Sequence, residues 1–158
     1  MHYRFPNEPG WCHGKIKNAG YRLTIPRRAI LQVLNNSRSH MSAEEIYLEV
    51  HKMYPAIGLT TVYRTLEMLV RMGLVSKFDF GDKRARYELA EGPGSKGHHH
   101  HLVCTKCGRI IDYKDFIDEE QELINKTEKG LSKKFNFEIH NHIIHFYGVC
   151  ESCREKGL

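Results

Sequence analysis

The chain has 158 residues and a formal net charge of +5, which allows one large domain or two small ones, each with a modest core. No run approaches the roughly 18 consecutive apolar residues of a membrane span, and Met1 to Gly10 lacks the apolar segment of a signal peptide. These features argue against a membrane-spanning protein, and we expect a cytosolic one.

The positive charge is concentrated in the first half of the chain. Residues 1–90 contain 14 Lys and Arg against 8 Asp and Glu, a balance of +6, whereas residues 91–158 contain 10 against 11, a balance of −1. This asymmetry favours a polyanionic partner such as DNA for the first half, because phosphate contacts supply most non-specific affinity. A solvated basic surface is the alternative interpretation.

Three helical patterns occupy the first half. We expect helices from Thr24 onward, from Ser42 to a point before Pro55, and from Thr60 or Thr61 to Met72. Ser42 and Glu45 have the spacing of a capping box, which satisfies two backbone N–H groups at a helix start. Gly73 follows the third pattern, where a left-handed cap is commonly needed.

An alternating segment, Leu74 to Phe80, precedes a polar turn at 81–84 and a second strand pattern from Ala85 to Leu89. This pattern predicts a hairpin. Three helices followed by a hairpin are typical of a winged helix-turn-helix, whose last helix enters the DNA major groove while the hairpin tip contacts the backbone.

The third helix carries Thr61, Tyr63 and Arg64 opposite its apolar stripe. Arg64 can form two hydrogen bonds to a guanine edge or contact a phosphate, and Tyr63 can contact a thymine methyl. Lys83 and Arg84 lie at the predicted tip of the hairpin, or wing. We therefore predict that these five residues bind DNA, although a surface helix with one Arg and one Tyr is common.

Glu91 to Gly97 concentrates Gly, Pro and Ser, which favour turning or flexible backbone. It also separates the basic half from the cysteine-rich half. We predict a DNA-binding domain at 1–90, a linker at 91–97 and a second domain at 98–158. The second domain is expected to be α/β, with strands at 102–104 and 109–113, a helix at 118–135 and a long strand at 138–149; the whole chain is thus α+β.

Two Cys-x-x-Cys pairs, Cys104 with Cys107 and Cys150 with Cys153, are separated by 42 residues. Four thiolates satisfy tetrahedral Zn²⁺ completely and leave no open position, so we predict a structural zinc site. A redox dithiol at one pair is the alternative. The fifth thiol, Cys12, has no evident partner in the sequence.

Four consecutive histidines occupy positions 98–101. In an extended segment successive side chains point to opposite faces, so His99 and His101 share one face while His98 and His100 share the other. The run could therefore supply two different metal sites. A solvated polar run is the alternative.

From about Gly20 to Cys153 the chain closely resembles the ferric uptake regulator family, whereas the first 19 residues extend beyond the family pattern. The matching motifs are Tyr-Arg-Leu-Thr-x-Pro-Arg at 21–27, Ser-Ala-Glu-Glu-Ile-Tyr at 42–47, Gly-Leu-Thr-Thr-Val-Tyr-Arg-Thr-Leu at 58–66, the His run leading into Cys104-x-x-Cys107-Gly108, and Tyr147-Gly148-x-Cys150-x-x-Cys153.

The resemblance implies a homodimeric transcriptional repressor that binds a palindromic DNA operator when a regulatory metal is loaded. It implies a structural zinc on the four paired cysteines and a C-terminal domain that dimerises. The regulatory ligands would be His40, Glu88, His99, His101 and Asp112. A further site found in some members would use His98, His100, Glu119 and His142.

Three imidazoles and two carboxylates suit Fe²⁺ or Mn²⁺, which makes iron the leading choice of regulatory metal. Asp112 departs from the pattern of the family's iron sensors, which usually have Glu at this position, whereas its peroxide sensors have Asp. Zinc sensing is a further alternative. Two functions of other classes are less favoured. A metallohydrolase is disfavoured because the sequence has no HExxH pattern, and we expect no enzyme. A zinc ribbon that binds RNA or protein would leave the first half of the chain without a function.

Overall fold

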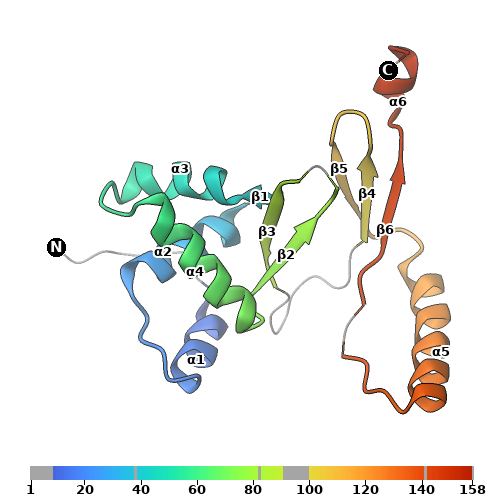
Figure 1. Cartoon of the computed structure of the whole chain (residues 1–158), viewed down its shortest axis with the longest axis horizontal. Helices are drawn as coiled ribbons and strands as arrows, with labels where there is room; N and C mark the ends of the chain where they lie inside the picture. The colour runs from blue at the N-terminus through green and yellow to red at the C-terminus, as the bar shows by residue number, and fades with distance from the viewer. Residues whose placement is uncertain (1–8, 38, 82, 91–99, 141, 158) are drawn as a thin grey trace. The chain divides into compact units, whose positions relative to one another are not determined.

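The computed structural model describes residues 9–37, 39–81, 83–90, 100–140 and 142–157. The chain divides into two compact units, Met1–Lys96 and Gly97–Leu158 (Figure 1). The linker predicted at 91–97 lies outside the described residues. Among the described helices, none combines the length and the apolar character required to cross a membrane.

The N-terminal unit contains the three predicted helices and one more. They are α1 (Gly10–Asn18), α2 (Ile25–Asn36), α3 (Ala43–Met53) and α4 (Leu59–Arg71). The sequence did not reveal α1, because its buried face consists of only Cys12 and Ile16, which is too short an apolar stripe to recognise. Cys12 is fully buried in the core, so its role is packing.

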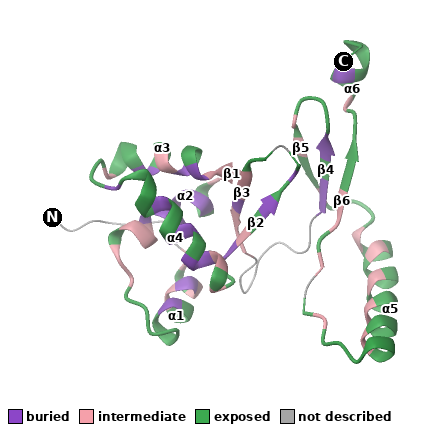
Figure 2. Cartoon of the chain, viewed as in Figure 1, coloured by how far each residue is buried: buried purple, intermediate pink, exposed green. Residues whose placement is uncertain are grey.

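Apolar stripes on α2, α3 and α4 meet to form the core of this unit (Figure 2). Ile30, Ile46, Leu66 and Leu69 are among its fully buried side chains. Each such side chain contributes about 1.5–3 kcal/mol through removal of apolar surface from water. The opposite side of α4 is left exposed, which is the side that carries the predicted DNA contacts.

Local signals define where these helices begin and end. The Ser42 backbone N–H donates to Glu45 Oε2 at 2.7 Å, and the Glu45 N–H donates to Ser42 Oγ at 3.2 Å, which confirms the capping box. After α4, Gly73 has φ +62°, a left-handed conformation that glycine adopts without a Cβ clash.

The predicted hairpin is confirmed as β2 (Val75–Asp79) and β3 (Ala85–Leu89), paired antiparallel. A two-residue strand, β1 (Met41–Ser42), pairs with the other edge of β3 in the register Met41↔Tyr87. It was not predicted, since two residues show no periodicity. Through this pairing, the residue before β1 comes to lie opposite the end of the wing.

The C-terminal unit is a three-stranded sheet with two helices. Its elements are β4 (His100–Cys104), β5 (Ile110–Tyr113), α5 (Ile117–Phe135), β6 (His145–Gly148) and α6 (Glu151–Glu155). The strand order is β5-β4-β6, with β4 antiparallel to β5 and parallel to β6. The long strand expected at 138–149 is wrong: of the described residues in this range, only 145–148 form a strand. These four residues are the ones that pair with His101 to Cys104 of β4.

The helix α5 has no buried residue, and its partly buried positions recur at helical spacing. They are Ile117, Glu120, Ile124, Glu128 and Ser132. Two carboxylates thus lie on the less exposed side of a helix that is otherwise solvated (Figure 2).

Candidate metal centres and nucleic-acid interface

The parallel pairing of β4 with β6 brings the two Cys-x-x-Cys pairs together. Cys104 ends β4 opposite Gly148, and the Thr105 backbone N–H donates to the Gly148 carbonyl at 2.8 Å. Cys107 lies on the turn between β4 and β5, and Cys150 is the N-cap of α6. Segments 42 residues apart in sequence therefore present their thiols to one point.

The four Sγ atoms all lie within 4.8 Å of one another. Cys107 Sγ and Cys150 Sγ are 3.8 Å apart, which equals the edge of a tetrahedron with zinc–sulfur bonds of about 2.3 Å, or roughly 3.8 Å. The donor set and its spacing therefore fit a closed zinc site.

The thiols of this cluster differ in acidity. The Cys150 backbone N–H donates to Cys104 Sγ at 3.3 Å, and this bond is the main reason why the pKa of Cys104 is lowered to about 6. The pKa of Cys153 is raised to about 12, chiefly by its side-chain hydrogen bond with Cys150 and then by burial. A bound divalent cation would favour the thiolate form of all four cysteines.

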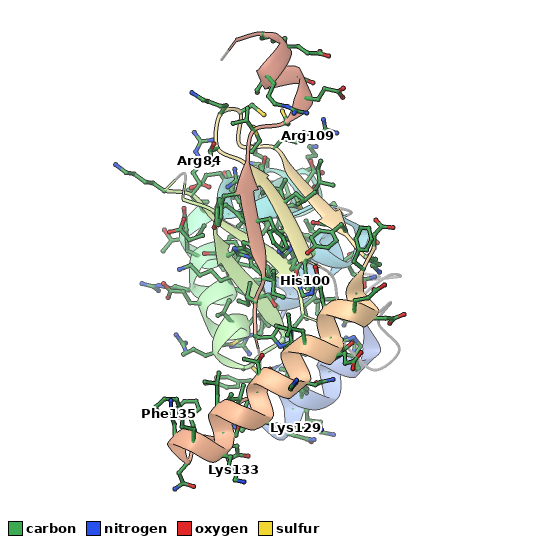
Figure 3. All side chains as sticks on the ribbon, turned by 90° about the vertical axis from the view of Figure 1, so that its right-hand side faces the viewer. Arg84, His100, Arg109, Lys129, Lys133 and Phe135 are labelled. Atoms are coloured by element: carbon green, nitrogen blue, oxygen red, sulfur yellow. The ribbon has the colours of Figure 1, made fainter. Side chains whose placement is uncertain are left out.

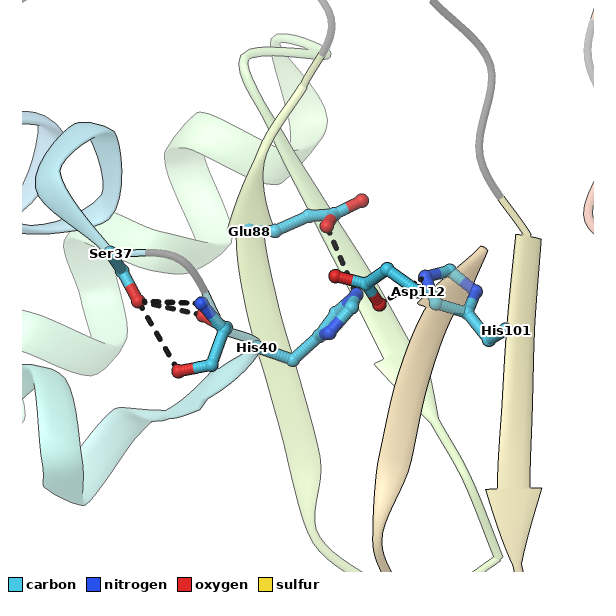
Figure 4. A network of polar contacts seen from close by, with 6 residues as sticks. Ser37, His40, Glu88, His101 and Asp112 are labelled. Atoms are coloured by element: carbon cyan, nitrogen blue, oxygen red, sulfur yellow. Dashed lines mark hydrogen bonds and ion pairs between the residues drawn. The ribbon is translucent and has the colours of Figure 1, made fainter. Parts of the chain in front are cut away.

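In the N-terminal unit, His40 and Glu88 form a pair of nitrogen and oxygen donors. His40 Nε2 lies 3.0 Å from Glu88 Oε2 (Figure 4). The rings of Phe78 and Phe80 meet the His40 ring edge-on, with centroids at 5.2 Å and 5.5 Å. Two aromatic contacts thus limit the orientations that this imidazole can adopt.

In the C-terminal unit, His101 has a side chain with a potential metal-ligand atom on each side of it. Asp112 on β5 and His145 on β6 are its register partners. His101 Nε2 and Asp112 Oδ1 are 3.7 Å apart (Figure 4), too far for a hydrogen bond but compatible with two ligands of one ion. His99, the other predicted ligand from this segment, lies outside the described residues.

His100 points to the opposite face of β4, as alternation predicts, and lies beside α5 (Figure 3). Its Nε2 is 3.0 Å from Glu120 Oε2, and the Tyr113 hydroxyl donates to Glu120 Oε1 at 2.9 Å. The pKa of Tyr113 is raised to about 12, first by burial and then by this carboxylate.

His142 of the predicted additional site also lies here, with Nδ1 2.9 Å from Glu128 Oε1 and its ring centroid 6.2 Å from that of His100. Glu119 is exposed instead, because one residue of helix rotates the side chain by about 100°. Glu120 and Glu128 were therefore missed. The spacing of the partly buried positions of α5 is the signal that could have found them.

On α4, Thr61, Tyr63 and Arg64 are exposed, as predicted for a DNA-contacting face. Lys83 and Arg84 are exposed at the tip of the wing, where Lys83 has φ +63°. Thus both elements of the N-terminal unit that would contact DNA present cationic side chains to solvent.

Glu44 is a contributor to this face that sequence reasoning missed. The Tyr63 hydroxyl donates a hydrogen bond to Glu44 across 19 residues of sequence. This bond is the main reason why the pKa of Glu44 is lowered and that of Tyr63 is raised. Glu44 thereby fixes the orientation of the tyrosine that we expect to contact bases.

Residues 18–147 match the family described as "Ferric uptake regulator family". The chain belongs to this family. The ferric uptake regulation protein of Bacillus subtilis is 38% identical over 143 residues, which cover 90% of this chain and 91% of that protein. The peroxide-responsive repressor PerR of Staphylococcus epidermidis is 32% identical over 143 residues, covering 90% and 87%.

A solved structure of the Helicobacter pylori ferric uptake regulator Fur, described as revealing three functional metal binding sites, has a TM-score of 0.69 to this Fur-family chain at 27% identity. The match covers 90% of this chain and 89% of that one. This chain is thus a metal-dependent, DNA-binding transcription regulator of the ferric uptake regulator family, whose members are regulators and not enzymes.

Mutation of the four-cysteine cluster tests whether it holds a structural zinc. Replacing Cys104 or Cys150 with Ser should reduce the zinc content from about one ion per chain to near zero and lower the melting temperature, because loss of a structural zinc removes folding free energy. Elemental analysis of the purified protein and thermal unfolding measure the two effects.

Cys12→Ala is the matched control, since Cys12 is buried in the other unit. It should reduce stability by removing a core atom yet keep the full zinc content. A Cys150→Ser protein that retains one zinc per chain and its original melting temperature would show that the assignment is wrong.

Proposed function

We propose that this protein is an iron-responsive repressor, which binds a palindromic DNA operator as a homodimer in the cytoplasm when Fe²⁺ is loaded. The observation that carries the proposal is a His–carboxylate pair in each unit: His40 with Glu88 in the first, and His101 with Asp112 in the second. Neither pair alone completes the coordination of a divalent transition metal.

The proposed regulatory ligands are His40, Glu88, His99, His101 and Asp112. A ligand set of imidazole nitrogens and carboxylate oxygens suits Fe²⁺ or Mn²⁺, whereas the regulatory site of a zinc sensor often includes a thiolate. The Bacillus subtilis relative, a ferric uptake regulation protein by name, supports iron. Manganese and zinc remain competing ions for the same donors.

Ligands contributed by two units can be satisfied by one ion in only one relative orientation of those units. An ion that binds this orientation more tightly than the others increases its population, by an amount set by the difference in affinity. In a dimer, that orientation determines the spacing of the two α4 helices. The metal would thereby act as corepressor.

The four cysteines are proposed to hold a structural zinc that ties the end of the chain to the start of the C-terminal unit. A further site is proposed at His98, His100, Glu119 and His142, and the contacts of His100 and His142 favour Glu120 and Glu128 as carboxylate ligands over Glu119. The Helicobacter pylori protein, described with three metal binding sites, supports such a third ion.

Dimerisation is proposed to use the C-terminal unit. Ile111, Leu102 and Phe146 are register partners across its sheet, and 39%, 42% and 49% of their surfaces are exposed. A continuous exposed apolar row of this kind commonly marks a protein–protein interface.

Peroxide sensing is the second candidate function, favoured by Asp112 and by the likeness to the PerR repressor. In that case Fe²⁺ would react with hydrogen peroxide, one of whose oxygen atoms would enter an imidazole ligand such as His40 or His99 while the other left as water. Loss of that ligand would release the DNA.

Anaerobic titration of operator binding with Fe²⁺, Mn²⁺ and Zn²⁺, repeated after dilute peroxide, separates these functions. An iron repressor should bind DNA with Fe²⁺ and lose binding when a chelator removes it. DNA release by peroxide, with one added oxygen in the peptide containing His40 or His99 by mass spectrometry, would establish the peroxide function. Absence of any metal dependence would refute both.

Mutation of the exposed face of α4 tests whether this helix contacts the operator. Arg64→Ala should weaken operator binding by about 1–3 kcal/mol if Arg64 contacts a base, with metal content unchanged. Lys83→Ala with Arg84→Ala is the matched comparison: it should weaken binding to all sequences alike and flatten the salt dependence. Fluorescence anisotropy on operator and scrambled duplexes measures both. Unchanged affinity of the Arg64 variant would exclude α4 as the recognition helix.

A further inference from the structure

His145 is a histidine of the C-terminal unit that none of the three proposed metal sites includes. It lies on β6, where it is the register partner of His101 on β4. On the other side of β4, His101 pairs with Asp112 of β5. Directly paired residues of neighbouring strands point to the same face of a sheet. One carboxylate and two imidazoles therefore form a row across the three strands, with His101 at its centre.

We propose that His145 is an additional ligand of the regulatory ion and completes its coordination. The inference rests on the proposed function, because it takes His101 and Asp112 as ligands of that ion. All of the geometry that carries it lies within the C-terminal unit.

The spacing of the two imidazoles fits a shared ion. The ring centroids of His101 and His145 are 5.1 Å apart and the ring planes are inclined by 72°. With metal–nitrogen bonds of about 2.1 Å, two imidazoles in adjacent coordination positions have ring centres roughly 4.5–5.5 Å apart. The centroid spacing of these two rings is therefore compatible with two ligands of one ion.

Tyr147 orients the ring of His145. The two residues are two positions apart on β6 and so share a face, and His145 Nδ1 lies 3.4 Å from the Tyr147 hydroxyl oxygen. Metal-bound histidines commonly have their second ring nitrogen held by a hydrogen bond, which fixes the tautomer and the direction of the first. Here the contact engages Nδ1, so Nε2 is the nitrogen that we propose as the ligand.

A sixth ligand changes the chemistry expected of the site. The five proposed ligands leave one position of an octahedron open, and peroxide requires that position to reach the iron. With His145 added, four imidazoles and two carboxylates fill the octahedron. The ligand set then favours an iron sensor that resists peroxide, even though Asp112 is the residue found in peroxide sensors.

The test uses Co²⁺ as a spectroscopic probe in the full-length protein with its zinc retained. His145→Phe keeps an aromatic ring against His101 but removes the ligand, and His145→Gln is a second variant of similar polarity. His140→Phe is the matched control, because the side chain of His140 is 77% exposed and has no place in a proposed site. Zinc content and melting temperature verify that each variant is folded.

Wild type and His140→Phe should show the weak visible absorption of six-coordinate Co²⁺. Both His145 variants should show stronger, shifted bands of lower coordination number and bind Co²⁺ about tenfold or more weakly. After iron loading and dilute peroxide, they should also accumulate more of the peptides with one added oxygen than the wild type does.

Folded His145 variants with the wild-type Co²⁺ spectrum and affinity would overturn the proposal. This failure is distinguishable from failure of the proposed function. If the wild type shows no metal-dependent DNA binding while its Co²⁺ spectrum depends on His145, the ligand assignment stands and the iron-responsive function does not.

Discussion

The parallel pairing of β4 with β6 is the constraint on which the candidate metal chemistry of the C-terminal unit depends. A single register places Cys104 opposite Gly148, beside the second cysteine pair, and His101 opposite His145. A slip of one residue would turn every side chain of β6 to the other face. The sulfur cluster and the His101 row would then both be lost.

This shared register would link the two proposed metal sites energetically. A zinc ion held by four thiolates at one end of β4 and β6 would stabilise the pairing of the two strands, and the same pairing positions His145 beside His101. The structural ion and the regulatory ion are thus proposed to act on one pair of strands. Their proposed roles differ because the four thiols all come from one unit, whereas the nitrogen–oxygen donors are proposed to come from both.

The aromatic residues around His40 play a comparable part in the N-terminal unit. Phe78 and Phe80 contact its ring edge-on, and β1 brings His40 opposite Glu88. Each unit therefore positions one imidazole and one carboxylate before any ion binds. Such preorganisation reduces the conformational entropy lost on binding and so increases metal affinity.

Local sequence signals were sufficient for much of the fold. The capping box at Ser42, the glycine after α4 and the alternation in the wing each identify an element without reference to the rest of the chain. The two Cys-x-x-Cys pairs likewise predicted a shared cluster, because four thiols at this spacing have few other uses.

What the sequence could not supply was the pairing of distant segments. The register of β6 against β4 decides that His145 lies beside His101, and no local pattern encodes it. Nor could a charged helix reveal that Glu120, and not Glu119, lies beside His100, since the two differ only in rotation about the axis of α5. The strand β1 was missed for a similar reason, because its two residues gain their conformation from β3.

One ion, bound by residues of both units, is proposed to select their relative orientation. Single-molecule energy transfer between fluorophores on non-natural amino acids at the exposed positions Lys52 and Lys129 measures this directly. We expect a broad distance distribution without the regulatory metal and a narrow one with it, and no narrowing in a His40→Ala protein. A distribution that stays unchanged while the wild type binds its full complement of metal would contradict the account.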